Sequence, residues 1–169
     1  MDSDTSIESP SLRLRPPTLP IERRAIGWWM LRNAIAGGVP LIILVTVANI
    51  WEPVRPWLIA PIIVVSLVLI AKIAVEPWWR FRVHRWEITE RATYAQSGWL
   101  VVERRVAPTT RIQTVDAVRG PLEQLFGLST LRVTTASSYG AIAIRGLDRR
   151  TADDAAARLT AVAELSEGD

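Results

Sequence analysis

Two long apolar segments constrain this chain more than any other feature. Residues 34–51 carry no charge, and residues 57–75 carry only Lys72. Each segment has about 18 or 19 residues, which as a helix extend ~27 Å and match the hydrocarbon thickness of a bilayer. The alternative is a pair of helices buried in a soluble core, but 169 residues cannot supply the layers to cover both. The sequence therefore predicts two membrane-spanning helices.

The loop between the segments and the charges around them predict a topology. Glu52 to Pro56 is short and contains two prolines, so the helices form an antiparallel hairpin. Arginines lie on the outer flank of each segment: Arg23, Arg24 and Arg32 before the first, and Arg80, Arg82 and Arg85 after the second. By the positive-inside rule, both termini are cytoplasmic and the loop faces outward.

Small and aromatic residues fit the same hairpin. Gly37 and Gly38 offer a face on which two helices can approach closely. Tryptophan favours the headgroup level of a bilayer. Six tryptophans lie beside the apolar segments, and we expect them to mark the interfaces: Trp28, Trp29, Trp51, Trp57, Trp78 and Trp79.

Composition excludes several functional classes. The chain has no cysteine and one histidine, which excludes disulfides, thiolate metal sites and a two-histidine relay. The net charge is only +3, and acidic residues are interleaved with the 20 basic ones, so no nucleic-acid footprint is present. We expect no metal, no cofactor and no nucleic-acid partner.

The first 20 residues differ from the rest. Residues 1–20 are rich in serine and proline and contain few large apolar side chains. Such a segment cannot bury enough surface to offset the entropy lost on ordering. We expect a disordered tail over 1–20, a juxtamembrane segment and hairpin over 21–79, and a soluble domain over 80–169.

Residues 80–169 are read as short strands followed by one helix. Leu100, Val102 and Val106 are expected on one face of a strand, and Thr151 with Asp154 resembles a capping box for the helix. Together the pattern predicts six or seven antiparallel strands and a terminal helix that plugs a bent sheet. The expected strands are 85–89, 92–96, 99–106, 111–118, 130–136 and 141–145, and the expected helix is 151–165.

A set of linked motifs runs through this region: Gly98-Trp99, Pro108 to Val115, Gly120-Pro121-Leu122, Phe126-Gly127-Leu128 and Leu131 to Ala136. With the hairpin, they resemble the YdbS-like bacterial pleckstrin-homology (PH) domain membrane proteins, over about residues 20–165. The resemblance implies a PH-like split β-barrel capped by the C-terminal helix, in the bacterial inner (plasma) membrane. It implies a membrane protein partner, such as a larger relative with repeated PH-like domains. It supplies no catalytic residues.

Individual candidates for catalysis are weak. His84 has no neighbouring carboxylate in the sequence to act with it as a general base. Asp153 and Asp154 suit the positive N-terminus of the last helix better than a metal ion. We therefore expect no enzyme.

Two groups of arginines are candidates for binding. Arg80, Arg82 and Arg85 lie beside the membrane and are expected to contact anionic lipid. Arg104, Arg105 and Arg111 are the candidate for a second basic face. The function expected is a non-catalytic binding or scaffolding module in a membrane protein assembly, with the bilayer, a membrane protein or a second copy of the chain as partners. The alternative is a membrane sensor that recognises anionic lipid.

Overall fold

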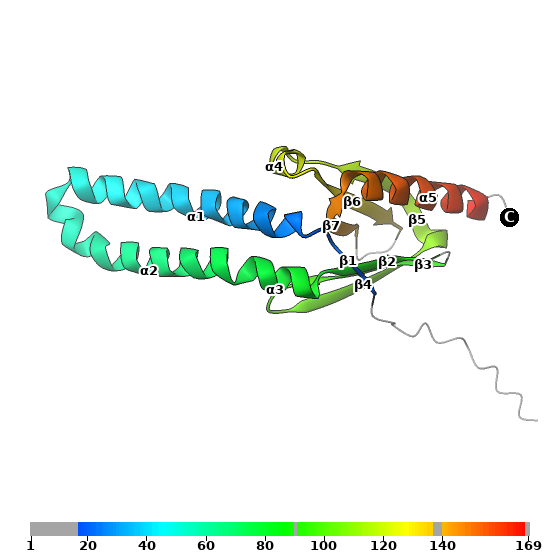
Figure 1. Ribbon diagram of the computed structural model, residues 1–169, viewed down its shortest axis with the longest axis horizontal. Helices are drawn as coiled ribbons and strands as arrows, with labels where there is room; N and C mark the ends of the chain where they lie inside the picture. Colours follow the sequence, from blue (N-terminus) through cyan, green and yellow to red (C-terminus); the bar gives the residue numbers. More distant parts are fainter. Residues whose placement is uncertain (1–16, 90, 137–139, 168–169) are drawn as a thin grey trace, which may run out of the picture.

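A long helical hairpin projects from a smaller domain of strands and helices (Figure 1). The computed structural model describes residues 17–89, 91–136 and 140–167. Both arms of the hairpin are long and apolar enough to cross a membrane, and their most apolar windows are almost wholly exposed. The helical elements of this part are α1 (Arg24–Ile50), the 3-10 turn η1 (Glu52–Val54), α2 (Arg55–Ala74) and α3 (Glu76–Val83).

Close packing between α1 and α2 depends on one glycine. A Cβ atom added at Gly37 would lie 2.4 Å from Leu69 Cδ1, whereas one added at Gly38 would meet nothing within 4 Å. The predicted small-residue face is therefore confirmed at Gly37 and wrong at Gly38, because only Gly37 faces the partner helix.

The domain contains two antiparallel sheets and a terminal helix. One sheet has the order β1-β2-β3-β4 and the other has the order β5-β6-β7. Among the described residues no ladder joins β4 to β5, so hydrogen bonds do not show a closed barrel. The strands are β1 (Leu19–Pro20), β2 (Arg85–Ile88), β3 (Ala92–Gly98), β4 (Val102–Pro108), β5 (Ile112–Val118), β6 (Leu128–Thr135) and β7 (Ile142–Asp148). The remaining helical elements are η2 (Thr109–Arg111), α4 (Pro121–Leu125) and α5 (Arg149–Glu167).

The segment before the hairpin belongs to the domain, which corrects the predicted boundaries. Leu19 and Pro20 form β1 and pair with Trp86 and Arg85. The prediction of a disordered tail over residues 1–20 is therefore wrong for residues 19 and 20. Its part over residues 1–16 lies outside the described residues. A two-residue strand has no periodicity of its own, and the pairing with β2 is what makes it a strand.

The domain core also takes in the start of α1. Trp28 and Trp29 are buried with Ile21 and Ala25 among side chains of β6, β7 and α5. The prediction that these two tryptophans mark the membrane interface is thus wrong. Residues 24–33 of α1 precede its apolar span, and within them Ala25, Trp28 and Trp29 are buried against the domain. Trp51, Trp57, Trp78 and Trp79 are exposed, as an interfacial position requires.

The turn between β3 and β4 differs from its prediction. Gly98 has φ +143°, and a Cβ there would lie 1.9 Å from the carbonyl oxygen of Val101. Only glycine allows so tight a turn. It holds residues 99–101 outside the sheet, so β4 begins at Val102 rather than at Trp99. The expectation that Leu100 shares a strand face with Val102 and Val106 is wrong, since Leu100 lies in the turn before β4, with its side chain 83% exposed.

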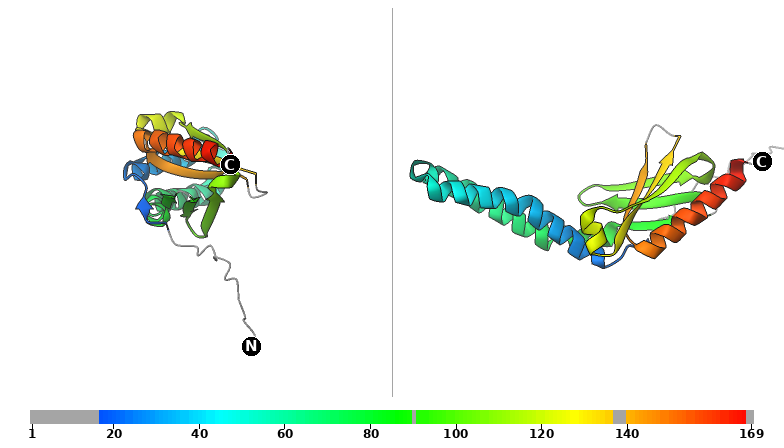
Figure 2. Two further views of the ribbon diagram at one scale, coloured as in Figure 1. Left: turned by 90° about the vertical axis from the view of Figure 1, so that its right-hand side faces the viewer. Right: turned by 90° about the horizontal axis from the view of Figure 1, so that it is seen from above.

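Helix α5 begins earlier than predicted. The Arg150 N–H donates to Asp148 Oδ1 at 2.9 Å, so Asp148, not Thr151, caps the helix. This bond is the main cause that lowers the Asp148 pKa, and the Arg24 guanidinium adds to the effect. Asp153 accepts two hydrogen bonds from Arg119 at 2.7 and 2.8 Å, which tie α5 to the segment that follows β5. The helix runs away from the hairpin, with the C-terminus at the far end of the domain (Figures 1 and 2).

Candidate functional site

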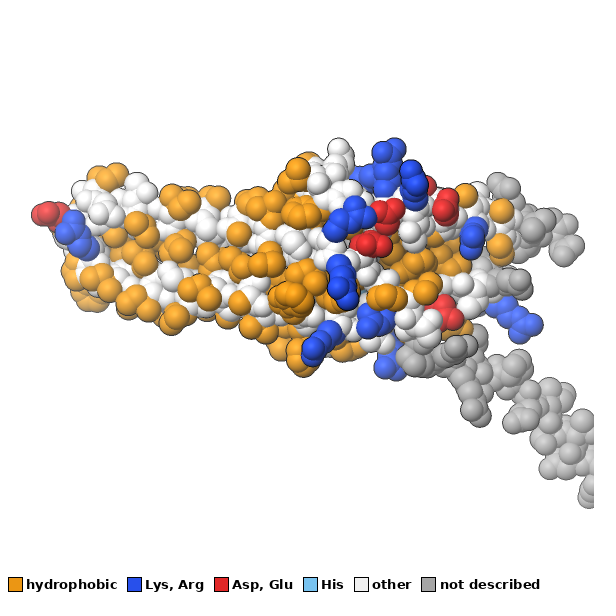
Figure 3. Space-filling view, in the orientation of Figure 1, with side chains coloured by type: hydrophobic (Ala, Val, Ile, Leu, Met, Phe, Trp, Pro, Cys, Tyr) orange, Lys and Arg blue, Asp and Glu red, His pale blue; other side chains and the backbone are white. Residues whose placement is uncertain are grey.

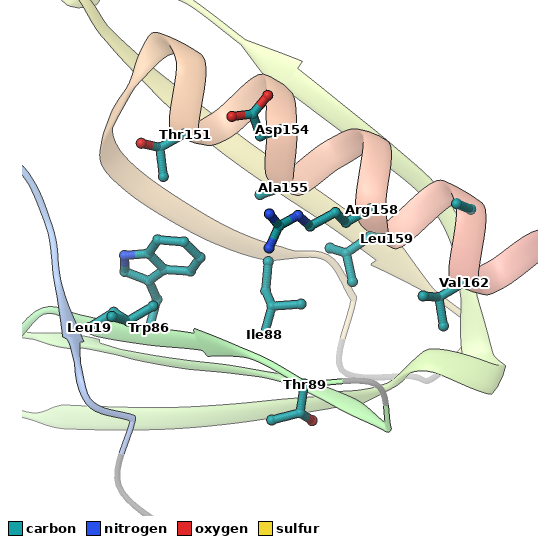
Figure 4. Close-up of a pocket in the computed structure, with 11 residues that line it drawn as sticks. Leu19, Trp86, Ile88, Thr89, Thr151, Asp154, Ala155, Arg158, Leu159 and Val162 are labelled. Carbon is teal, nitrogen blue, oxygen red and sulfur yellow. The ribbon is translucent and has the colours of Figure 1, made fainter.

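An open groove of about 570 Å³ lies between α5 and the β1–β2 edge (Figure 4). Trp86 and Ile88 line it from β2, and Ala155, Leu159 and Val162 line it from α5. We call it the α5–β2 groove. Figure 3 shows hydrophobic side chains exposed between the helix and this edge.

Local sequence patterns build both walls of the groove. Trp86 and Ile88 are two residues apart in a strand, so their side chains lie on the same face. Ala155, Leu159 and Val162 follow helical spacing, so they form one stripe on α5. The small side chain of Ala155 leaves room opposite the indole of Trp86.

The described residues cover the backbone edge beside the groove only in part. β1 pairs with Arg85 and Trp86 and then ends. Next along the edge, the Glu87 carboxylate accepts hydrogen bonds from the backbone N–H and the hydroxyl of Thr18, both at 3.1 Å. Beyond that point β1 supplies no ladder partner to Ile88. An extended chain can add to such an edge.

The chemistry of the groove suits binding rather than catalysis. Its lining is mainly apolar, and the charged side chains on it are one acid, Asp154, and one base, Arg158. An anionic headgroup needs an excess of basic groups, which this pair does not supply. In the described part of the chain, no three His, Asp or Glu side chains are grouped to hold a metal ion.

A second polar cluster lies where α1 meets α3. Arg80 forms an ion pair with the buried Glu76 (3.1 Å), and its guanidinium lies 5.7 Å from the centre of the Trp29 ring. Asn33 donates to Glu76 Oε2 at 3.3 Å and to the Lys72 carbonyl at 3.1 Å. These contacts tie α1 to the end of α2 and to α3. Arg80, predicted as a lipid contact, is thus engaged inside the protein.

His84 completes this junction as a neutral ring. Its Nδ1–H donates to the Arg80 carbonyl at 2.8 Å, and its ring centre lies 5.1 Å from that of Trp29. Burial is the main cause that lowers the pKa of His84 to about 4; the hydrogen bond to the Arg80 carbonyl opposes this shift, and the nearby charges of Arg80 and Arg145 add to it. A group that is neutral throughout the physiological range and has no carboxylate beside it serves structure here.

The other predicted basic residues do not form one site. Arg82 is exposed on α3, whereas Arg85 is half-buried and donates to the carbonyl oxygens of Phe81 and His84. Arg104 and Arg105 border a hollow of about 310 Å³ together with Glu103, which pairs with Arg105 at 2.9 Å. Arg111 lies in η2, at the opposite end of β4, and does not line this hollow. The structure therefore separates Arg111 from Arg104 and Arg105.

Sequence reasoning missed the α5–β2 groove, although part of its signal is present. The helical spacing predicts the apolar stripe of α5 and places Leu159 toward the core. Leu159 is buried and also lines the groove. The opposite wall comes from Trp86 and Ile88 of the predicted strand 85–89, but Leu19 beside them belongs to β1, a strand that periodicity cannot reveal.

A membrane-type helical hairpin, two antiparallel sheets and a terminal helix packed against them define a membrane-attached PH-like protein. The family described as Bacterial PH domain matches residues 37–163, and the chain belongs to this family. It is 28% identical to the "UPF0699 transmembrane protein YdbS" of Bacillus subtilis (strain 168), over 96% of this chain and 98% of that protein. No solved structure gives a significant match.

Proposed function

We propose that this protein is a non-catalytic scaffold: a PH-like split barrel, held at a bacterial plasma membrane by its hairpin, that binds a segment of another membrane protein. The observation that carries the proposal is the α5–β2 groove, with an apolar lining beside a strand edge that β1 only partly covers. A segment bound there would lie along β2 beyond Glu87, which Thr18 of the chain itself contacts, and place apolar side chains against α5. Such strand addition combines backbone hydrogen bonds with side-chain pockets.

The position of the groove favours a protein over a lipid headgroup. α5 runs away from the hairpin, so most of its groove wall lies beyond the membrane-proximal end of the domain (Figure 1). The charges on the groove, Asp154 and Arg158, balance. A partner in the same membrane, such as a larger relative with repeated PH-like domains or a second copy of this chain, could reach it with a cytoplasmic segment.

The proposed location follows from the hairpin and its flanking charges. Arg23, Arg24 and Arg82 are exposed on the domain side of the helices, whereas the outer loop carries one acid and one base, Glu52 and Arg55. By the positive-inside rule the domain and both termini are cytoplasmic.

Site-specific photo-crosslinking tests the binding role. Ala161 and Ala157 are both exposed on α5, but only Ala161 lines the groove. A photoreactive residue at position 161 of the full chain, irradiated in native membranes, is expected to give a discrete protein adduct. The same residue at position 157 is the matched control and is expected to give none.

A blocking variant completes the test. Ala161→Arg, added to a chain with the photoreactive residue at 162, should abolish the adduct, and Ala157→Arg should preserve it. Equal adducts from positions 161 and 157 would contradict the groove as the binding site. Adducts with lipid alone at position 161 would support the alternative function, a membrane sensor for anionic lipid.

A further inference from the structure

Two turns of the domain expose large apolar side chains. Leu100 and Val101, between β3 and β4, are 83% and 79% exposed, and Leu125 at the end of α4 is 72% exposed. We call these three residues the apolar tips. The described part of the fold leaves these large side chains uncovered, and exposed apolar surface that gathers in one place is typical of an interaction site.

The connectivity brings both turns to the same end of the domain. β3 runs into the first turn, β4 leaves it for η2 at the opposite end, and β5 returns to α4. In Figure 1 and in the right-hand view of Figure 2, the β3–β4 turn and α4 both extend toward the helical hairpin and lie beside its domain end. The apolar tips therefore flank the hairpin where its apolar spans begin.

Specific contacts hold each turn against the hairpin. The Trp79 indole N–H donates to the Trp99 carbonyl at 2.9 Å, which ties α3 to the β3–β4 turn. On the other side, a Cβ added at Gly27 would lie 3.0 Å from the Phe126 ring, so α1 and the end of α4 are in close contact.

The α4 turn is also braced from within. The buried Glu123 carboxylate accepts hydrogen bonds from the Gly120 N–H at 2.8 Å and from the Thr130 hydroxyl at 2.6 Å. This network fixes the short helix that carries Leu125. Both turns that carry the apolar tips are thus held in place by contacts with groups elsewhere in the fold.

We propose that the apolar tips insert into the bilayer leaflet nearer the domain. The domain then has three contacts with the membrane: the hairpin, the β3–β4 turn and α4. The occupant of this surface is lipid because α3, whose Trp78 and Trp79 are exposed, directly follows the exposed apolar helix α2 and contacts the β3–β4 turn through the Trp79–Trp99 hydrogen bond. Tryptophan at this level and the exposed Arg82 on α3 match the headgroup region. A domain held at three points cannot swing about the hairpin, so the α5–β2 groove keeps a fixed orientation relative to the membrane.

The absence of cysteine makes the test direct, because each introduced cysteine is the only labelling site. Leu100→Cys, Leu125→Cys and Thr110→Cys full-length chains are labelled with an environment-sensitive fluorophore and reconstituted in phosphatidylcholine vesicles. Thr110 is exposed in η2, at the far end of β4, and is the control. Labels at 100 and 125 are expected to emit at shorter wavelength than the label at 110. Vesicles with brominated acyl chains should quench them, in low and high salt alike.

Leu67→Cys, exposed in the middle of α2, reports whether the hairpin is inserted. If the label at position 67 is quenched but the label at 100 or the label at 125 is not, the proposal is overturned. Short-wavelength emission at 100 and 125 without quenching by brominated lipid would show that protein covers the tips, and would overturn it too. Because all readings come from one labelled position in a membrane-inserted chain, the outcome is independent of whether the groove binds a partner.

Discussion

At the residue scale, the buried junction of Trp29, Glu76, Arg80 and His84 explains most about how the hairpin joins the domain. Arg80 pairs with the Glu76 carboxylate, and the His84 ring donates to the Arg80 carbonyl. Buried charged and polar side chains stabilise a fold only when they have ion-pair or hydrogen-bond partners such as these. The junction therefore depends on the ring of His84 remaining neutral.

His84→Gln should make the stability of the domain less dependent on pH. The folded-state pKa of His84 is about 4, below its ordinary value of 6.5, so the unfolded chain binds the proton more readily between these values. Wild-type stability is therefore complete above about pH 6.5 and falls as the pH drops toward 4, by up to about 3 kcal/mol. Glutamine can retain a hydrogen bond to the Arg80 carbonyl but does not titrate.

Thermal unfolding in detergent micelles at pH values from 7 to 4 measures this difference. Carboxylates titrate in the same range in both proteins, so the difference between the two melting curves isolates His84. Parallel pH profiles for the wild type and the variant would contradict the assignment.

At the element scale, matched substitutions can test which side of a helix faces the rest of the protein. Gly37 and Gly38 are neighbours in α1, but only Gly37 faces α2. Gly37→Leu should force the helices apart, since overpacking of close contacts costs about 1–3 kcal/mol. Gly38→Leu should be tolerated, because a Cβ there meets nothing.

Disulfide crosslinking reads this effect out. Cysteines at Ala36 and Val65, which both border the hollow between α1 and α2, should crosslink less readily with Gly37→Leu than with Gly38→Leu. Equal crosslinking in both variants would mean that the helices do not pack as described.

Leu159→Asp should unfold the domain while leaving membrane insertion intact. Leu159 is 1% exposed in the core, and an unpaired carboxylate there costs several kcal/mol. Ala157→Asp on the exposed side of the same helix is the control. Limited proteolysis in vesicles should degrade the domain of the first variant only, and a resistant Leu159→Asp domain would contradict the helix orientation.

At the scale of the whole molecule, the domain is not separable from the hairpin. Ile21, Ala25, Trp28 and Trp29 precede the apolar span of α1 and lie in the domain core. A fragment that begins at β2 lacks all four. Experiments on binding therefore need the full chain in a membrane or detergent.

The proposed topology can be tested with two single-cysteine chains, Val54→Cys in the loop and Arg150→Cys at an exposed position on α5. In intact cells an impermeant thiol reagent should label the Val54→Cys chain and not the Arg150→Cys chain, because the arginines flanking the helices hold the domain inside. Both chains should react after the cells are opened. If only the Arg150→Cys chain is labelled in intact cells, the topology is the opposite of the one proposed.

Much of this protein could be predicted from its sequence, because the signals concerned are local. Charge-free segments of bilayer length predict the hairpin. Alternating and helical patterns locate β2, β5 and α5 to within a few residues. The linked motifs indicate the bacterial PH domain family, and the family match confirms it.

Only the tertiary structure decided which apolar residues face protein and which face outward. The sequence pattern predicts Trp29 at the membrane interface and Leu100 within a strand, yet Trp29 is fully buried in the domain and Leu100 is exposed in a turn. β1 exists only through its pairing with β2, and the α5–β2 groove combines Leu19 of β1, side chains of β2 and the apolar stripe of α5. Burial and pairing are set by segments far apart in the chain, so no local pattern can specify them.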